Sequence, residues 1–377
     1  MPKNSTVGGD DAPGITAAVA ACGSNSTILF SGNETYNLLT PLSFTSLSGV
    51  KFSFEGNISL SQNITEIQAA VNNTKIYPGH WITIKGSDVT FSGSKSQDGG
   101  WFLAHGQQWW SAGNQIARPH WFTFSVTGLV IEDLKILKPI AWVFSIKGSN
   151  VTMTNTYIDA RSDDAFPFNT DGVDLSGNNV LIDGFECHNG DDMVNVSPDA
   201  TNITVRNVLA TGTHGIAVSC SSGTAGNYLF EDIVVRDSLF GARFKGSLGT
   251  TCNLSNVTWR NFEIHNTSYP IHFIENYVDQ EKGAAGMNAS VAAFADAFSW
   301  ENITGSASTT LKDGSCITDP CWSYTEGTYS PNAPLANVSD LFSGESLNKA
   351  VYMMCNDQAH CMNFHFADIN LTTAVSF

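Results

Sequence analysis

The sequence is poor in charged residues, and above all in basic ones. Asp, Glu, Lys and Arg make up 14% of its 377 residues, against about 25% in an ordinary soluble protein. Lys and Arg number 18 while Asp and Glu number 35, which leaves a formal net charge of −17. Such a chain repels phosphate backbones, so a nucleic-acid partner is excluded. An acidic polysaccharide would need a few well-placed cations, or an acidic medium, to bind.

The sequence also lacks an apolar run of the roughly 18 residues that a transmembrane helix needs, so we expect no membrane partner. Its eight cysteines show no zinc-type spacing, which favours disulfides in an oxidising compartment. Sixteen Asn-X-Ser/Thr sequons also favour a secreted, extracellular glycoprotein, although chance produces some of them where Asn, Ser and Thr abound. We expect a monomer. The candidates for local disulfides are Cys316 with Cys321 and Cys355 with Cys361.

A short pattern recurs along the chain: an Asn, alternating apolar residues, an Asn or Asp, and further alternation. It begins at Asn150, Asn179, Asn202, Asn227 and Asn256, at steps of 23 to 29 residues. Alternation predicts short strands with one inward face, and a unit of this length closes a core only when it is stacked on others. The pattern therefore predicts an all-β parallel β-helix, with a β-sandwich as the less favoured alternative because a sandwich has no fixed repeat.

A stack of coils needs caps at its two ends, and we expect residues 1–377 to form one such domain. Residues 10–22 have the pattern of an amphipathic helix with Pro13 in its first turn, which predicts an N-terminal capping helix. The cysteine-containing region after about residue 315 is expected to close the C-terminal end.

Polar residues interrupt the repeat at steps close to one coil. Asp191 follows Asp171 by 20 residues, His214 follows Asp191 by 23, and Arg243 follows His214 by 29. Residues one coil apart lie about 4.8 Å apart in a parallel stack, so these groups are expected to share one patch. Lys245 alternates with Arg243 across Phe244, so both cations are expected on one side of a strand.

Carboxylates packed together predict a division of roles. Repulsion between like charges raises the pKa of at least one of them, which leaves a protonated acid beside ionised bases. Hydrolysis of a glycosidic bond needs that division, because one group protonates the leaving oxygen while another activates water. Arg243 and Lys245 would then face a carboxylate of the substrate, and His214 would hydrogen-bond to an aspartate and tune it.

The motifs NTDG, GDD, HG and RxK, in this order over residues 169–277, resemble glycoside hydrolase family 28, the polygalacturonase family. The resemblance implies a right-handed parallel β-helix, inversion at the anomeric carbon and no metal or organic cofactor. By motif position, Asp191 would be the general acid, and Asp171 and Asp192 would hold and activate the water. The supporting residues would be Asn169 and His214, and the residues that bind galacturonate would be Arg243, Lys245 and Tyr277.

The sequence departs from the family pattern beside these motifs. Met193 stands where relatives usually carry a cysteine, Thr213 precedes the HG pair, and a Ser219–Gly223 loop replaces a glycine-rich stretch. These changes, with the scarcity of Lys and Arg, favour xylose-substituted galacturonan as the substrate. Plain polygalacturonase action, endo or exo, is the alternative.

Other interpretations of the polar and aromatic residues stay open. The pair Asp163 and Asp164 precedes NTDG and is interpreted as a solvated loop or a cleft rim. Trp109 and Trp110 could stack on sugar rings, but packing in the core or a cap is at least as well supported. A calcium-dependent pectate lyase and a non-catalytic polysaccharide-binding β-helix are the two competing functions.

Overall fold

The computed structural model describes residues 8–247, 249–277, 291–308, 350–356 and 359–373. The chain divides into two compact units, Met1–Gly190 and Asp191–Phe377, and each is described by itself. The single-domain organisation expected from the sequence stays a prediction. The region that was expected to cap the C-terminal end falls largely outside the described residues, together with Cys316 and Cys321. None of the described helices has the length and the apolar character of a membrane-spanning helix.

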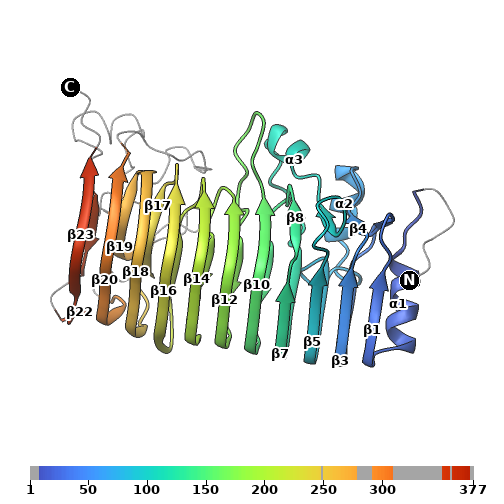
Figure 1. The fold of residues 1–377 in the computed structure, drawn as a ribbon, viewed down its shortest axis with the longest axis horizontal. Coiled ribbons are helices and arrows are strands. Elements are labelled where there is room, and N and C mark those ends of the chain that lie inside the picture. The colour runs from blue at the N-terminus through green and yellow to red at the C-terminus, as the bar shows by residue number, and fades with distance from the viewer. Residues whose placement is uncertain (1–7, 248, 278–290, 309–349, 357–358, 374–377) are drawn as a thin grey trace. The chain divides into compact units, whose positions relative to one another are not determined.

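Unit 1 is a stack of parallel β-helix coils (Figure 1). Parallel pairs join β1 to β3, β3 to β5, β5 to β7, β7 to β10 and β10 to β12. The helices are α1 (Ala12–Ala21), α2 (Ile64–Val71) and α3 (Gln107–Ser111). The strands are β1 (Ser24–Phe30), β2 (Thr35–Asn37), β3 (Leu42–Phe54), β4 (Asn57–Ser59), β5 (Ile82–Gly93), β6 (Trp101–Leu103), β7 (Phe122–Glu132), β8 (Lys135–Leu137), β9 (Phe144–Ile146), β10 (Ser149–Asp159), β11 (Val173–Leu175) and β12 (Asn178–His188).

Unit 2 has the same construction, so the predicted right-handed parallel β-helix is confirmed. Within it, β14 pairs with β16, β16 with β18, and β18 with β20. Its described strands are β13 (Val194–Val196), β14 (Thr201–Thr211), β15 (Ile216–Cys220), β16 (Thr224–Arg236), β17 (Phe240–Ser247), β18 (Asn253–Thr267), β19 (Tyr269–Tyr277), β20 (Phe294–Ala307), β21 (Val351–Met354), β22 (Cys361–Met362) and β23 (His365–Thr373).

The recurring asparagines mark a bend in each coil. Asn150, Asn179, Asn202, Asn227 and Asn256 all have φ between 54° and 63°, a left-handed conformation that Asn tolerates better than most residues. Their side chains also bond to each other from coil to coil: the Nδ2 of Asn256 donates to the Oδ1 of Asn227 over 2.8 Å. The sequon at Asn150 therefore has a structural origin. In each coil the Asn at the bend is followed by a buried residue and then by an outward residue, which here is Thr152. Glycosylation stays a prediction.

The interior of each unit is apolar and rich in stacked aromatic rings. In unit 1 the rings of Phe30 and Phe54 are 4.6 Å apart. In unit 2 the rings of Trp259 and Trp300 lie 5.3 Å apart with only 7° between their planes. Rings at equivalent positions of successive coils bury large areas and contact each other favourably, which stabilises the stack.

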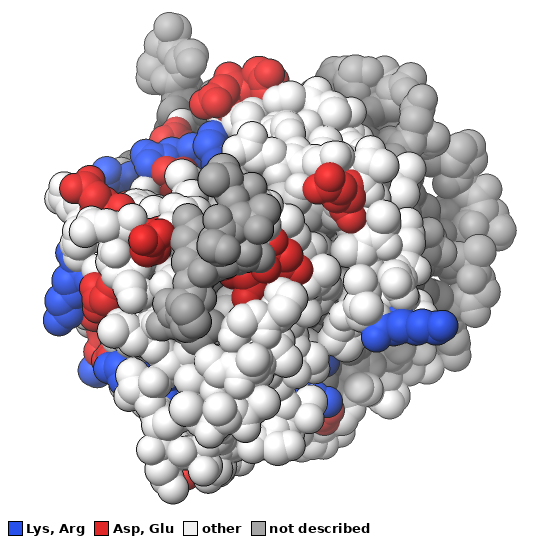
Figure 2. Space-filling view, turned by 90° about the vertical axis from the view of Figure 1, so that its right-hand side faces the viewer, with Lys and Arg blue, Asp and Glu red and all other residues white. Residues whose placement is uncertain are grey.

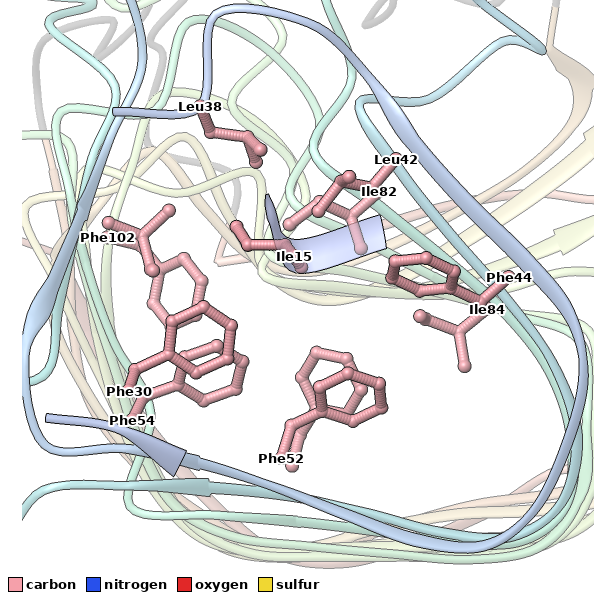
Figure 3. A pocket seen from close by; sticks show the side chains of 12 residues that line it. Ile15, Phe30, Leu38, Leu42, Phe44, Phe52, Phe54, Ile82, Ile84 and Phe102 are labelled. Carbon is pink, nitrogen blue, oxygen red and sulfur yellow. The ribbon is translucent and has the colours of Figure 1, made fainter. Parts of the chain in front are cut away.

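The predicted capping helix is α1, with Pro13 in its first turn. It buries Ala12, Ile15 and Val19, and Ile15 points into an apolar cavity inside the first coils (Figure 3). Phe30, Phe52 and other apolar side chains line the rest of this cavity. The helix therefore covers apolar surface that the first coil would otherwise expose.

The face shown in Figure 2 is mostly uncharged, with basic and acidic residues in small separate groups.

The cysteines only partly follow the expectation. Cys355 and Cys361 form a disulfide, as predicted. A second disulfide joins Cys220 to Cys252, which are 32 residues apart. Cys22 is a free exposed thiol and Cys187 is a free buried one, so disulfides do not account for every cysteine.

Candidate active site

The acidic pair of the GDD motif lies in the turn that precedes β13. The backbone N–H of Asp192 donates to the Oδ1 of Asp191 over 2.8 Å, and this bond holds the first carboxylate in place. The next turn lies beside it, because the N–H of His214 donates to the carbonyl of Asp191 (2.8 Å) and the N–H of Met193 donates to the carbonyl of Gly215 (3.0 Å). The two motifs are therefore neighbours within unit 2.

Gly215 is required for this close approach. Its φ is +83°, and a Cβ at this position would lie 2.2 Å from the carbonyl oxygen of Gly241 on the next coil. Any other residue would push the two coils apart. The Gly of the HG motif therefore serves the backbone, and the His serves the site.

Asp192 is buried and contacts two cations. Its Oδ1 accepts a hydrogen bond from the Nη1 of Arg243 at 3.0 Å, and its Oδ2 accepts one from the Nζ of Lys245. The side chains of Asp192, Arg243 and Lys245 are 3%, 2% and 8% exposed. Buried charges of this kind are stable only when they are paired. The three groups therefore form one ionic unit with a net charge of +1.

Strand β17 explains how both cations reach the same carboxylate. Arg243 and Lys245 alternate across Phe244, which is buried in the core. In the ladder, Arg243 lies beside Ala217, and Ala217 lies beside Asn195. The small side chain of Ala217 leaves room for the guanidinium to cross its coil. The ring of Phe240 supports this group, with its centroid 4.0 Å from the Cζ of Arg243.

Tyr277 closes the same cluster at the end of β19. Its ring centroid lies 5.5 Å from the Nζ of Lys245 and 5.9 Å from the Cζ of Arg243. Burial raises the pKa of its hydroxyl above the usual value, against the effect of the two cations. The phenol therefore remains neutral and can donate a hydrogen bond.

Asp191 is paired with His214 instead. The Nδ1 of His214 lies 2.9 Å from the Oδ1 of Asp191, whose side chain is 15% exposed. The prediction that His214 would hydrogen-bond to an aspartate is confirmed. Burial alone would raise the pKa of Asp191, but the imidazolium of His214 and then the charge of Lys245 outweigh it, so the pKa is lowered.

This direction differs from the expectation of a carboxyl kept protonated by its acidic neighbour. The reason is that each of the two aspartates has its own cationic partner, so repulsion between them is not the dominant effect. Burial lowers the pKa of Lys245, but the charge of Asp192 outweighs it and raises the pKa above the usual value. Lys245 therefore stays protonated beside Asp192.

The cluster also has the composition of a metal site, since ligand atoms of Asp191, Asp192 and His214 lie within 4.8 Å of one another. The contacts around it do not suit a divalent ion. Both oxygens of Asp192 are engaged by Arg243 and Lys245, and a metal bound to them would be repelled by these two cations. The expectation of no metal stays a prediction.

The first motif, NTDG, belongs to unit 1. Asn169 has a φ of +52°, and its Oδ1 accepts a 2.6 Å hydrogen bond from the Nη2 of Arg118. Asp171 is 7% exposed and precedes β11, and its carbonyl accepts a hydrogen bond from the N–H of Val143 at 3.0 Å. The predicted roles of Asn169 and Asp171 stay predictions.

Comparisons with known proteins agree with the motifs. The family model for glycosyl hydrolases family 28 matches residues 22–325. The chain belongs to glycosyl hydrolases family 28. It is therefore a glycoside hydrolase, as predicted.

Individual relatives are similar over nearly the whole chain. The "Probable exopolygalacturonase C" proteins of Neosartorya fischeri and Aspergillus flavus are each 33% identical, over 96% of this chain and 81% and 82% of their own lengths. Among solved structures, the endo-xylogalacturonan hydrolase of Aspergillus tubingensis is similar with a TM-score of 0.72 at 20% identity, over 99% of this chain and 92% of the other. The polygalacturonase of Erwinia carotovora ssp. carotovora has a TM-score of 0.62 at 14% identity, over 100% and 94%. These two structures support the fold.

The departures from the family pattern have structural roles here. Met193 is fully buried, so an apolar side chain fills the place where the family usually carries a cysteine. The hydroxyl of Thr213 donates to the carbonyl of Asp191 over 2.8 Å and accepts from the N–H of Gly215 over 3.0 Å. Thr213 therefore ties the HG turn to the GDD turn.

The structure distinguishes buried from exposed residues among the less specific candidates. Trp109 and Trp110 are 0% and 3% exposed, so they pack in the interior. Asp163 is 81% exposed and lies 3.6 Å from the Nζ of Lys138, while Asp164 accepts hydrogen bonds from Gln107 and Ser111. Both belong to a solvated loop. Sequence reasoning missed Arg118, whose only signal is that it is one of few basic residues in the chain.

Proposed function

We propose that this family 28 hydrolase cleaves α-1,4 linkages of a galacturonan backbone with inversion, from one end of the chain. The observation that carries the proposal is the presence of two adjacent aspartates in different surroundings. Asp192 is held between two buried cations, and Asp191 is paired with His214. Relatives that carry the name exopolygalacturonase, at 33% identity over 96% of the chain, support the galacturonan substrate and the exo action.

In this mechanism Asp191 protonates the leaving oxygen, while Asp192 and Asp171 hold and activate the water that attacks from the opposite face. Arg243 has guanidinium N–H groups beyond the one that Asp192 accepts, and Lys245 has three donors in total. They can therefore bind a substrate carboxylate without releasing Asp192. Tyr277 and Asn169 provide further hydrogen-bonding groups.

The pKa of Asp191 is lowered in the free protein, and a bound uronate would raise it again by changing the charge around the carboxyl. The lowering depends on the charges of His214 and Lys245. A galacturonate carboxylate bound beside Lys245 adds a negative charge that offsets this effect, so the pKa of Asp191 rises when the substrate binds. A neutral sugar at the same place would leave the pKa low. The acid therefore becomes protonated preferentially in the complex with a uronate.

The test is the Asp191→Asn variant. It is expected to lose turnover of polygalacturonate by at least about a thousandfold, as removal of a catalytic acid does, while it retains its fold by circular dichroism. The exposed Asp163→Asn variant serves as the matched control and is expected to keep full activity. Full turnover by Asp191→Asn would refute the assigned acid.

The products separate the competing functions. The first product detected by proton NMR is expected to have the β configuration, because inversion converts the α linkage. An unsaturated end and loss of activity in a chelator would instead indicate a calcium-dependent lyase. Binding of galacturonan without any cleavage would indicate a non-catalytic binding protein.

Preference for xylose-substituted galacturonan stays a prediction. Its support is the departure from the family pattern at Ser219–Gly223, where this chain lacks the glycine-rich stretch. Digestion of plain and xylose-substituted galacturonan side by side, with product lengths measured, tests it. Release of monomers from the plain polymer alone would refute the substitution preference and support exo action. The same secreted, extracellular setting is expected for either substrate.

A further inference from the structure

A row of ring side chains in unit 1 leads up to Asp171, and none of the rings has a role in the mechanism above. His80, His120, Trp142 and Asp171 each lie two residues before a strand of the same face, β5, β7, β9 and β11. Backbone bonds hold them in register: Trp81 N–H donates to the carbonyl of His120 over 2.7 Å. The N–H groups of Trp121 and Val143 likewise donate to the carbonyls of Trp142 and Asp171, over 2.9 Å and 3.0 Å. Trp142 is therefore one coil from Asp171 on one side and one coil from His120 on the other.

Trp142 is exposed in a way that its neighbours are not. It is 40% exposed, whereas Trp81 and Trp121 on the two preceding coils are 0% and 1% exposed. The ring of His120 stacks on it at 4.3 Å with 24° between the planes. This contact fixes the orientation of the indole and covers one of its faces. The rest of the indole, which the 40% exposure reports, is available to a ligand.

Basic residues gather around this row in a chain that has few of them. Lys147 is exposed on the same coil as Trp142. Burial, and after it the charge of Lys147, lowers the pKa of His80 to about 4, so the ammonium lies near this imidazole. Burial, with smaller effects of His80 and Arg118, also lowers the pKa of His120 to about 4. The two imidazoles are therefore neutral above about pH 5, and the positive charge comes from the lysine and the arginine.

We propose that Trp142 and Lys147 form a binding subsite for a uronic acid residue of the substrate chain. An aromatic ring offers an apolar face to the C–H groups of a sugar ring, and a sugar-binding site adds a few polar groups that fix orientation. Lys147 supplies the charge for the carboxylate, and the hydroxyl of Ser145, half-buried between them in the sequence, supplies a hydrogen-bonding group. This inference rests on the proposed galacturonan substrate.

The test measures binding and turnover separately. The Trp142→Ala variant is expected to raise the KM for polygalacturonate about tenfold, with kcat changed less than twofold, and Trp142→Phe is expected to recover most of the loss. Trp101→Ala is the matched control, because Trp101 is a partly exposed tryptophan of unit 1 that packs against Tyr157 and Lys135 instead. Thermal melting of each variant reports on the fold.

The role of charge is tested with Lys147→Gln. This variant is expected to raise the KM for polygalacturonate several-fold. Its affinity for the methyl-esterified polymer, measured by titration in the Asp191→Asn background, is expected to stay unchanged because the ester has no charge to bind. Lys95→Gln, with a side chain that is 85% exposed, is the control. Each substitution is also combined with Asp191→Asn, and galacturonate oligomers are titrated into these inactive proteins. The dissociation constants should differ between variants as the KM values do.

The outcomes distinguish the two proposals. If the wild-type protein neither binds nor cleaves galacturonan, the proposed function and this subsite both fail. If the wild-type protein cleaves galacturonan and both Trp142→Ala and Lys147→Gln bind it as tightly as the controls do, the subsite alone is wrong.

Discussion

Asp191 and Asp192 are adjacent in sequence, yet their replacement by Asn should have very different effects on stability. The carboxylate of Asp192 is 3% exposed and is the shared partner of Arg243 and Lys245. Its neutralisation leaves two buried cations beside each other, and breaking a buried ion pair in this way costs about 3–5 kcal/mol. Asp191 is 15% exposed and has the imidazole of His214 as its paired partner. Loss of this single charge-assisted contact should cost about 1.5–3 kcal/mol.

Thermal melting at neutral pH, followed by circular dichroism, measures the difference. A gap of about 2 kcal/mol should lower the Tm of Asp192→Asn below that of Asp191→Asn by about 2–3 °C in a chain of this length. Both variants should lack activity, so activity alone does not separate them. Addition of Lys245→Met to Asp192→Asn removes one unpaired cation and should recover part of the Tm. Equal Tm values for the two single variants would refute the view that Asp192 is the anchor of a buried ionic unit.

Three further predictions follow from the same structure. The pKa of Asp191 is depressed in the folded protein. The carboxylate therefore stabilises the fold fully above the unfolded pKa of about 4, and this stabilisation is lost as the pH falls through the folded pKa. In Tm measurements from pH 5 to pH 2, Asp191→Asn should lose less stability than the wild type. Gly215→Ala should yield little folded protein because its Cβ would collide with the next coil, whereas Gly113→Ala, also at positive φ but with open space around its Cβ, should cost about 1 kcal/mol by denaturant titration. Replacement of both Cys220 and Cys252 by Ala should cost about 2–4 kcal/mol in the same assay, because it releases a loop of 32 residues in the unfolded chain.

The fold could be predicted from the sequence because a bend in each coil has a residue signature. Asn150, Asn202 and Asn256 adopt the left-handed conformation that few residues tolerate, and the buried residue that follows each of them marks the start of a strand. Pro13 marked the capping helix for a similar reason, since its fixed φ suits the first turn of a helix. Local backbone requirements of this kind are visible in a single sequence.

Long-range pairing was less visible. The disulfide between neighbours Cys355 and Cys361 was predicted from proximity, whereas nothing in the spacing pointed to Cys220 with Cys252, which meet only because two coils bring them together. The same limit explains Cys187, which is buried in the core where it has no thiol to pair with among the described residues. Trp142 escaped notice because exposure cannot be read from a residue type.

The positions of Arg243 and Lys245 show how a coil ladder changes the interpretation of a motif. The number of residues between them predicted that Arg243 lies one coil beyond His214 and beside it. In the ladder Ile216 pairs with Ala242. The residue in register with His214 is therefore Phe240, which lies two residues before Ala242. Arg243 lies three residues further along its strand and reaches back over Ala217 to a carboxylate two coils away. The RxK motif is therefore needed first to balance the charge of Asp192. In that role Lys245 stays protonated and the guanidinium of Arg243 keeps its permanent charge. Any carboxylate of the substrate therefore meets a site that is already positive, in a chain whose net charge is strongly negative. This local reversal of sign allows an acidic protein to bind an acidic polysaccharide.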